Sequence, residues 1–386
     1  MTTLRPSKIT IVGSGLFGLT MAERIATQLK IPVRIIERRK HLGGNAYSEF
    51  DAETQIEIHK YGSHLFHTSN ETVWNYVNRF SAFTSYQHTV WSKHGLNLYS
   101  MPINLATINS YFGKSFSPSE AVKLIEDQRK EITHRPSNLE EKAISAIGRP
   151  LYEAFISGYT LKQWQTDPKE LDESIINRLP VRFNLSNRYF NDKHEGLPEI
   201  GYTKMMEKMI DNPLIELNLG SDYFEIKNSL PDNELCIYTG PIDRYFEYRH
   251  GRLTWRTLDF EFETLPVSDF QGTSVVNYPD LEVPFTRIHE FKHLHPERVN
   301  DSGKTVVAKE YSRFALSNDD EPYYPVNSAK DRELLSKYRN ESDTLENVMF
   351  GGRLGTYQYL DMHMAIASAF SMFNNAVIPW VEQNMI

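Results

Sequence analysis

The chain has 386 residues, a formal net charge of −8 and a single cysteine, Cys236. This length allows two or three domains around a large core, and the acidic balance argues against a nucleic-acid partner, which requires a basic surface. One cysteine cannot form an internal disulfide, and Cys236 stands in an apolar run that is typical of a strand core.

The N-terminus leads almost directly into the first predicted strand, which leaves no room for a signal peptide. No apolar run in the sequence approaches the length of a membrane span. We therefore expect a cytoplasmic protein without a membrane partner.

The N-terminal segment predicts a dinucleotide-binding βαβ unit. Residues 8–12 read as a buried strand, a helix is expected to about Leu29, and a second strand, residues 33–36, ends at Glu37. Between the first strand and the helix stands the turn Gly13-Ser14-Gly15-Leu16-Phe17-Gly18. Glycines let a backbone approach a pyrophosphate, the helix N-terminus stabilises its charge, and an acid one strand later takes the ribose hydroxyls. An ordinary tight turn is the alternative, but the strand, helix and acid all stand in the expected order.

Two further glycine pairs favour FAD over NAD. Leu42-Gly43-Gly44-Asn45-Ala46 follows Glu37 closely, so a second stretch of bare backbone can face the same ligand, as in flavoproteins. Near the C-terminus, Phe350-Gly351-Gly352-Arg353 precedes an apolar helix that runs through Phe370. Those glycines suit a helix cap, or a third set of backbone N–H donors that closes the cofactor site.

The middle of the chain is helical from about Asn104 to Leu179. Ser117-Pro118-Ser119-Glu120 has the pattern of a capping box, Asp167-Pro168-Lys169-Glu170 repeats it, and Asn138 is a third helix start with Gly148 as its stop. From about Gly251 to Ser312 the pattern changes to strands, at residues 257–263, 273–277, 286–291 and 305–311. Their alternation predicts an antiparallel sheet with one wet face. Residues 234–240 predict a strand that returns to the nucleotide domain, where Thr239 and Gly240 approach the cofactor.

We therefore predict an α/β fold: a Rossmann-like FAD-binding domain with a helical insertion and an antiparallel β-sheet domain. The FAD-binding domain is discontinuous, formed by residues 1–80, 195–250 and 325–386. Residues 100–178 form the helical substrate domain with a mobile segment, and residues 81–99, 179–194 and 251–324 form the sheet domain. A cofactor domain interrupted in this way places a substrate cleft between the modules.

Aromatic and arginine side chains gather in the segments expected to line that cleft. Residues 155–164 combine three aromatics with glycine and polar residues, a pattern that is also typical of a helix core. Arg178, Arg182 and Arg188 then stand near aromatics in an acidic protein. Aromatics that stack on a base and arginines that fork onto phosphates suit a nucleotide diphosphate substrate.

Several blocks resemble bacterial UDP-galactopyranose mutase and span nearly the whole chain in family order. They are Gly43-Gly44-Asn45-Ala46-Tyr47, Tyr61-Gly62-Ser63-His64-Leu65-Phe66-His67-Thr68, Gly158-Tyr159-Thr160-Leu161-Lys162-Gln163-Trp164, Arg178-Leu179-Pro180-Val181-Arg182-Phe183, Gly240-Pro241-Ile242-Asp243, Tyr323-Tyr324-Pro325, and Gly352-Arg353-Leu354 with Tyr359-Leu360-Asp361-Met362-His363.

The resemblance implies an isomerase that interconverts UDP-galactopyranose and UDP-galactofuranose, the latter for cell-surface polysaccharide biosynthesis. It implies a homodimer with non-covalent FAD, active in the reduced form and reduced by NADPH, NADH or another flavin reductant. In the family chemistry, N5 of reduced FAD attacks the anomeric carbon of the sugar as UDP leaves, with no net redox change.

The resemblance also assigns roles to individual residues, and it implies no metal site. For catalysis it implies Arg178, Arg287, His67, Tyr324 and Tyr359, with the two arginines on the diphosphate. The implied substrate-binding residues are Phe155, Tyr159, Thr160, Trp164, Arg178, Tyr189, Arg287, Tyr324 and Tyr359, with Trp164 at the start of the mobile segment that carries Arg178. The predicted cofactor-binding residues are Gly13, Ser14, Gly15, Leu16, Phe17, Gly18, Glu37, Arg38, Gly43, Gly44, Asn45, His64, Leu65, Thr239, Gly240, Arg353, Tyr359, Asp361 and Met362.

Three positions depart from the family pattern. Gln165 follows the tryptophan where glycine is common, Ile156 replaces an aromatic, and Ser63 replaces a small residue or proline. These departures leave open whether the sugar is galactose or N-acetylgalactosamine. The alternatives to this function are a flavin oxidoreductase of amine-oxidase type, an NAD-dependent sugar-nucleotide epimerase or dehydrogenase, and a non-catalytic relative such as a Rab GDP-dissociation inhibitor.

Overall fold

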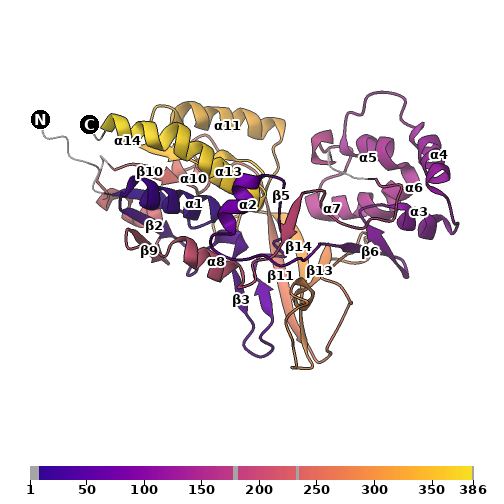
Figure 1. Ribbon diagram of the computed structural model, residues 1–386. Coiled ribbons are helices and arrows are strands. Elements are labelled where there is room, and N and C mark those ends of the chain that lie inside the picture. Colours follow the sequence, from indigo (N-terminus) through magenta and orange to yellow (C-terminus); the bar gives the residue numbers. More distant parts are fainter. Residues whose placement is uncertain (1–7, 177–180, 232–233, 385–386) are drawn as a thin grey trace, which may run out of the picture.

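A five-stranded parallel sheet forms the first layer of the molecule. The computed structural model describes residues 8–176, 181–231 and 234–384 (Figure 1). The strand order is β16-β10-β1-β2-β9, and every neighbouring pair is parallel. The strands are β1 (Ile9–Val12), β2 (Val33–Glu37), β9 (Ile215–Leu219), β10 (Cys236–Tyr238) and β16 (Val348–Phe350). The βαβ unit and the returning strand at residues 234–240 are therefore as predicted.

Side chains of this sheet alternate between two apolar layers. Ile11, Ile35 and Ile237 belong to one core, which they share with α1, α8 and α13. Ile36 and Tyr238 face the other side. A sheet buried on both faces explains why its strands read as continuous apolar runs. The helices of this region are α1 (Leu16–Arg24), which continues as a π-helix (Ile25–Leu29), α2 (Glu71–Val77), α8 (Tyr202–Met209), α9 (Tyr223–Ile226) with a 3₁₀ turn (Lys227–Ser229), α10 (Ile242–Tyr245), α11 (Ala329–Ser342) and α12 (Gly352–Thr356).

The C-terminal helix differs from the sequence expectation. α13 (Met362–Met372), a π-helix (Phe373–Val377) and α14 (Ile378–Asn384) form one stretch of 23 residues, within which a window of 18 residues has a mean hydropathy of 1.3. Among the described residues, this stretch alone is long and apolar enough to cross a membrane by length and composition. The expectation that no run approaches this length was wrong. Ser368, Asn374 and Asn375 interrupt the apolar residues, but the mean hydropathy of the segment stays high enough for a membrane span. One such helix is a weak indication, since the core helix of a soluble protein meets the same test. Here α13 packs on α1.

A seven-stranded sheet stands beside the first layer, in the order β15-β11-β14-β13-β12-β6-β7. All neighbours are antiparallel except β12 and β6, which pair in parallel, so the predicted sheet is mixed at one position. Its strands are β6 (Val90–His94), β7 (Asn97–Met101), β11 (Trp255–Leu265), β12 (Val275–Asn277), β13 (Arg287–Glu290), β14 (Thr305–Phe314) and β15 (Tyr324–Pro325), and a 3₁₀ turn (Phe291–Leu294) follows β13. Two small antiparallel pairs join β3 (Ser48–Phe50) to β4 (Glu57–His59), after a 3₁₀ turn (Gly44–Ala46), and β5 (Phe66–Thr68) to β8 (His194–Gly196).

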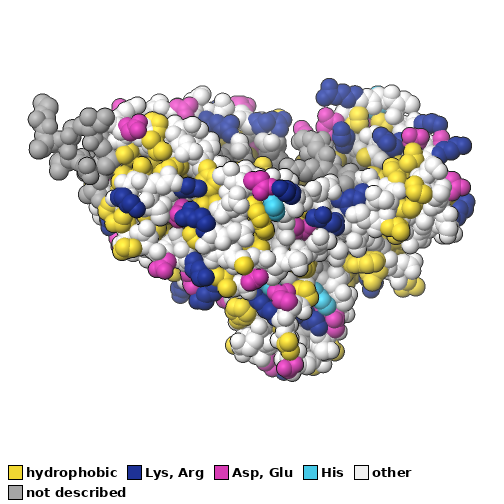
Figure 2. Space-filling view, in the orientation of Figure 1, with side chains coloured by type: hydrophobic (Ala, Val, Ile, Leu, Met, Phe, Trp, Pro, Cys, Tyr) yellow, Lys and Arg dark blue, Asp and Glu magenta, His cyan; other side chains and the backbone are white. Residues whose placement is uncertain are grey.

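The helical insertion forms a separate lobe with its own core, on the far side of the seven-stranded sheet from the parallel sheet (Figure 1). It comprises α3 (Leu105–Phe112), α4 (Pro118–Arg129), α5 (Leu139–Ile147), α6 (Arg149–Tyr152), a π-helix (Glu153–Ser157), α7 (Gly158–Trp164) and a 3₁₀ turn (Glu173–Ile176). On the face shown in Figure 2, acidic and basic side chains are interspersed over both lobes.

Helix starts in this lobe match the sequence at two of three positions. Ser117 forms the predicted capping box of α4, and α5 runs from its cap Asn138 to Gly148. Asp167 starts no helix: its carboxylate accepts from Lys169 N at 2.9 Å in a turn that ends at Glu170. An Asx turn of this kind satisfies the same donors without a helix behind it.

Candidate active site

The turn between β1 and α1 is built around glycines. Gly13 has φ +102°, and a Cβ there would lie 2.1 Å from Thr239 Oγ1, at the end of β10. A Cβ on Gly18 would lie 2.1 Å from Gly13 O. At Gly15, in contrast, a Cβ would meet nothing within 4 Å, because this residue faces an open pocket. No side chain caps α1, so its first-turn N–H groups remain available to a ligand.

Two more glycine turns line the same pocket. Gly43 (φ +95°) donates its N–H to Ser14 O at 2.8 Å, and a Cβ on Gly44 would lie 3.1 Å from Gly15 Cα. Gly352 (φ +71°) begins α12 beside Thr239. Backbone segments from residues 13–18, 43–45, 239–240 and 351–353 thus meet around one cavity, as the sequence predicts for a dinucleotide.

Glu37 ties the end of β2 to the first glycine turn. Its carboxylate is buried and accepts hydrogen bonds from Ser14 N, Ser14 Oγ and Arg39 N, each at 2.8 Å. Glu37 lines the pocket, and a carboxylate has lone pairs for further donors. Its role toward a ribose stays a prediction.

Most of the predicted cofactor residues lie in the lining of this pocket. They are Gly13, Gly15, Leu16, Phe17, Gly18, Glu37, Arg38, Gly43, Gly44, Asn45, His64, Thr239, Gly240, Arg353 and Met362, whereas Ser14, Leu65, Tyr359 and Asp361 lie outside it. The lining also includes residues that sequence reasoning missed: Ser221, Asp222, Tyr223, Phe224, Arg244, Tyr248, Arg252 and several residues between 315 and 322. No local motif marks them, because they reach the pocket only through the packing of distant segments.

His64 is a neutral imidazole at the edge of the pocket. Burial lowers its pKa to about 4, and Nδ1 lies 2.7 Å from the backbone oxygen of Gly62.

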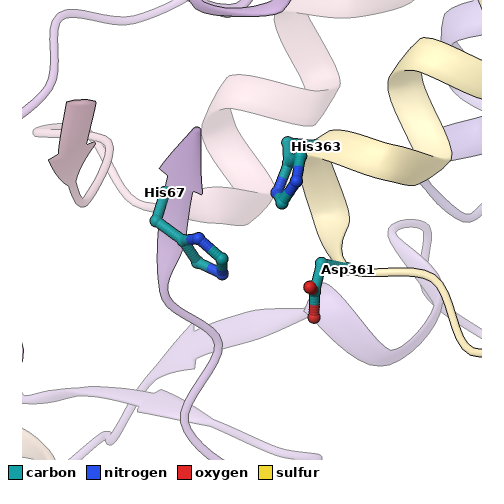
Figure 3. A group of neighbouring side chains, drawn as sticks. All are labelled: His67, Asp361 and His363. Atoms are coloured by element: carbon teal, nitrogen blue, oxygen red, sulfur yellow. The ribbon is translucent and has the colours of Figure 1, made fainter. Parts of the chain in front are cut away.

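His67, Asp361 and His363 lie together where β5 approaches the start of α13 (Figure 3). The His67 ring stacks on Phe190 at 3.7 Å, and its Nδ1 lies 2.7 Å from Asp192 Oδ2. One ligand atom from each of the three residues falls within 4.8 Å of the others. Two imidazoles and a carboxylate are a ligand set that transition metals accept. That this protein needs no metal stays a prediction.

Arg287, at the start of β13, is surrounded by tyrosine hydroxyls. Its Nη2 donates to Tyr159 Oη, and Tyr189 and Tyr324 are further electrostatic neighbours. Burial by itself lowers the pKa of Arg287, but the Glu310 carboxylate, 3.3 Å from Nε, more than offsets this, so the pKa is raised and the charge is permanent. Arg178, the other predicted arginine, lies outside the described residues.

A row of side chains connects Arg287 to the glycine pocket. The Tyr324 ring stacks on Tyr359 at 5.8 Å, and the Arg353 guanidinium lies 5.1 Å from the centre of the Tyr359 ring. Arg353 lines the pocket. The predicted cofactor side and the predicted substrate side are therefore adjacent.

The predicted uridine wall is less open than the sequence suggests. Phe155 is 4% exposed and packs edge-to-face on Tyr99 and Tyr111 in the core of the helical lobe. Thr160 is also buried, whereas Trp164 is half-buried at the end of α7. Contact of these side chains with a base stays a prediction.

Two cations hold α7 in place. Lys162 is partly buried, and its Nζ shares its three donors among the carbonyl oxygens of Tyr278, Asp280, Val283 and Phe285, in the loop that leads to Arg287. Fully buried Arg256 donates from Nε to Gln163 O at 3.0 Å, from Nη1 to Gln165 Oε1 at 3.1 Å and from Nη2 to Ser312 Oγ at 3.1 Å. Within the part of the chain that the structure describes, no ion pair joins Arg256 to a carboxylate. Burial, together with the charge of Arg313, lowers the pKa of Arg256 to about 10.

The chain is similar to known proteins over nearly its whole length. Residues 154–359 match the UDP-galactopyranose mutase family, and residues 11–80 match the NAD(P)-binding Rossmann-like domain. A probable UDP-galactopyranose mutase of Klebsiella pneumoniae is 44% identical over 94% of this chain and 92% of its own length. A dTDP-fucopyranose mutase of Escherichia coli is 39% identical over 94% of this chain and 96% of its own length. A crystal structure of reduced UDP-galactopyranose mutase has the same fold, with a TM-score of 0.74 at 16% identity over 99% of this chain and 97% of that chain.

The first testable prediction concerns Gln165, which ends α7 in the left-handed conformation (φ +48°). We expect Gln165→Ala to lower the free energy of unfolding by about 1.5 kcal/mol, since it removes a hydrogen bond to a charged group. Gln165→Gly loses the same bond but relieves a left-handed conformation that costs about 1 kcal/mol, so it is expected to lose less. Urea titration of the variants measures this order.

Gln55 offers a matched control, because it is also exposed and left-handed (φ +58°) but its amide bonds only backbone oxygens. There, Gly is expected to be at least as stable as Gln. A Gln165→Gly variant more stable than the unmodified protein would show that the bond to Arg256 contributes less than the relief of the left-handed conformation, contrary to the prediction.

Proposed function

The chain belongs to the UDP-galactopyranose mutase family, and on that basis we propose that it interconverts UDP-galactopyranose and UDP-galactofuranose with FAD as its cofactor. Such a mutase is an isomerase, which rearranges the sugar ring without net oxidation. The observation that carries the proposal is the row Arg353, Tyr359, Tyr324, which joins a dinucleotide pocket to a permanently charged arginine.

The residues of the pocket fit FAD. Gly15 leaves open space where a side chain would stand, and the uncapped N-terminus of α1 suits a pyrophosphate. The second glycine turn, at Gly43 and Gly44, lies against the first and extends the bare backbone along the same cavity. When bound and reduced, FAD supplies an electron-rich ring nitrogen, N5, that is able to act as a nucleophile at an anomeric carbon. NADPH, NADH or another flavin reductant is proposed to keep it reduced.

Side chains of the protein hold the nucleotide while the sugar rearranges. Arg287 would orient the diphosphate and stabilise the negative charge that grows on the leaving UDP. Tyr189, Tyr324 and Tyr359 would donate hydroxyl hydrogen bonds to the same phosphates. Arg178 is assigned a matching role on the resemblance alone, and His67, buried and anchored by Asp192, would lie against the sugar.

A second candidate follows from the comparisons. A relative that is 39% identical over nearly the whole chain is named dTDP-fucopyranose mutase. Proteins this similar to the chain therefore differ in both the base and the sugar of their substrate, and we keep dTDP-fucopyranose as the second candidate substrate. UDP-N-acetylgalactosamine is the third candidate substrate. Cytoplasmic location and a homodimer are proposed by kinship with the family.

The function is tested by turnover of a purified, dithionite-reduced sample. We expect UDP-galactofuranose to be converted to UDP-galactopyranose, with separation by chromatography, and no conversion by the oxidised protein. dTDP-fucopyranose and UDP-N-acetylgalactosamine are assayed in parallel. Conversion of dTDP-fucopyranose alone would favour the second candidate, and full turnover by oxidised protein would exclude the proposed role of reduced FAD.

Gly15→Ala tests the cofactor site. Because its φ of −70° suits any residue and its Cβ would face open space, we expect a folded protein that has lost its yellow flavin absorption and that melts at the same temperature as the unmodified protein stripped of FAD. Gly13→Ala, in contrast, places a Cβ against Thr239 at positive φ, so both stability and flavin are expected to fall. Normal flavin content in Gly15→Ala would contradict the proposed position of the pyrophosphate.

Arg287 is tested for its role with the nucleotide. Removing one partner of a buried charge pair costs about 2–5 kcal/mol, so we expect Arg287→Ala to lower kcat/KM roughly 30-fold or more while bound FAD is retained. Arg287→Lys keeps the charge but loses the fork geometry, and is expected to recover part of the activity. The control is Lys309→Ala, on the neighbouring β14, whose partners Glu261 and Glu263 lie at the surface. Equal activity in the Arg287 and Lys309 variants would remove Arg287 from the site.

A further inference from the structure

Three polar side chains, Glu310, His289 and Ser63, form a connected group beside the Nε atom of Arg287. Glu310 on β14 lies directly opposite Arg287 on β13, and His289 follows two residues after Arg287, so Arg287, His289 and Glu310 share one face of the sheet. Glu310 is 3% exposed and His289 is 2% exposed. Ser63 reaches this group from the turn after β4, with its Oγ 2.8 Å from His289 Nδ1.

Hydrogen bonds join the three in sequence. His289 Nε2 lies 3.0 Å from Glu310 Oε2, and Glu310 Oε1 accepts from Thr286 Oγ1 at 3.2 Å. Glu310 Oε1 also lies 3.3 Å from Arg287 Nε, in an ion pair that lacks hydrogen-bond geometry. Burial raises the pKa of Glu310, but the charge of Arg287 and the His289 hydrogen bond outweigh it, so the pKa is lowered and Glu310 is a carboxylate.

The charge of Glu310 fixes the protons of the chain. A carboxylate can only accept, so the proton of the imidazole is on His289 Nε2. Burial lowers the pKa of His289 despite the attraction of Glu310, so the ring is neutral and its Nδ1 is an acceptor. Ser63 Oγ–H therefore donates to Nδ1. Each hydrogen bond in the order Ser63, His289, Glu310 thus has one defined donor and one defined acceptor.

We propose that Ser63, His289 and Glu310 are positioning residues that hold the Arg287 guanidinium, through its Nε edge, in the orientation that receives the diphosphate of a nucleotide. This inference rests on the proposed function. An arginine side chain loses rotamer freedom when it is fixed, and here that loss occurs on folding rather than on binding. Its Nη2 donates to Tyr159.

The test measures UDP binding to the FAD-loaded protein by isothermal titration calorimetry. Ser63→Ala removes one neutral hydrogen bond and is expected to weaken UDP binding about threefold to tenfold, whereas Ser63→Thr keeps the hydroxyl and is expected to retain affinity. His289→Phe keeps the ring but takes the donor from Glu310, and is expected to weaken binding tenfold or more. His293→Phe is the matched control, because His293 pairs with Asp269 and Glu290 instead, and its affinity for UDP is expected to be unchanged.

A double-mutant comparison separates positioning from a general loss of structure. If His289 acts through Arg287, then His289→Phe causes no further loss of UDP affinity in the Arg287→Ala protein. Additive losses, or a lower melting temperature with unchanged affinity in His289→Phe, would overturn the inference. Failure of the unmodified protein to bind UDP would instead reject the proposed substrate, and the two failures are therefore distinguishable.

Discussion

The close approach of backbone turns at the end of the parallel sheet is the constraint on which the rest of the site depends. Gly13, Gly44 and Gly352 each stand where a side chain would strike a neighbouring turn or require a positive φ. Thr239, at the end of β10, fills the space between the first and third turns. Because these positions lack side chains, residues far apart in sequence share one cavity. The same contacts fix the start of α12 and therefore the position of Arg353. The substrate side is then set by the row Arg353, Tyr359 and Tyr324, which starts from that cavity.

Positive charge in the interior is the second organising feature, in a chain that is acidic overall. Three cations, one fully buried and two partly buried, are held differently. Lys162 is surrounded by four carbonyl oxygens, Arg256 by oxygens of Gln163, Gln165 and a serine, and Arg287 by a carboxylate and a tyrosine. Only the last has an anionic partner among these contacts. A cation that is stabilised by carbonyl and hydroxyl oxygens holds chain segments together. A guanidinium that is oriented by a carboxylate has a fixed orientation and still attracts a phosphate.

Sequence patterns predicted the parts of this structure that local rules govern. The βαβ unit, the glycine turns, the main strands and the caps at Ser117 and Asn138 all follow from periodicity or from a local hydrogen bond. The helix start predicted at Asp167 was wrong because an Asx turn and a helix cap have the same residues. Only the packing of the residues that follow decides between the two. The far end of the pocket, around Ser221 and residues 315–322, has no local signal because packing alone brings it there. For Phe155, the pattern by itself favoured a helix core, the resemblance assigned it to the ligand wall, and its ring packs in the core of the helical lobe.

The positions where the chain departs from the family pattern are informative for the same reason. Gln165 and Ser63 each look like a neutral replacement in the sequence, yet each side chain makes a hydrogen bond that a glycine or a proline has no atoms to make. Gln165 binds Arg256 at the end of α7, where the proposed mobile segment begins, and Ser63 binds the histidine beside Arg287. Both departures therefore act on the elements that carry the two proposed diphosphate arginines and not on the cofactor glycines. Under the proposed function, we therefore expect changes at these two positions to alter the affinity for a nucleotide sugar and not the chemistry that the cofactor would supply.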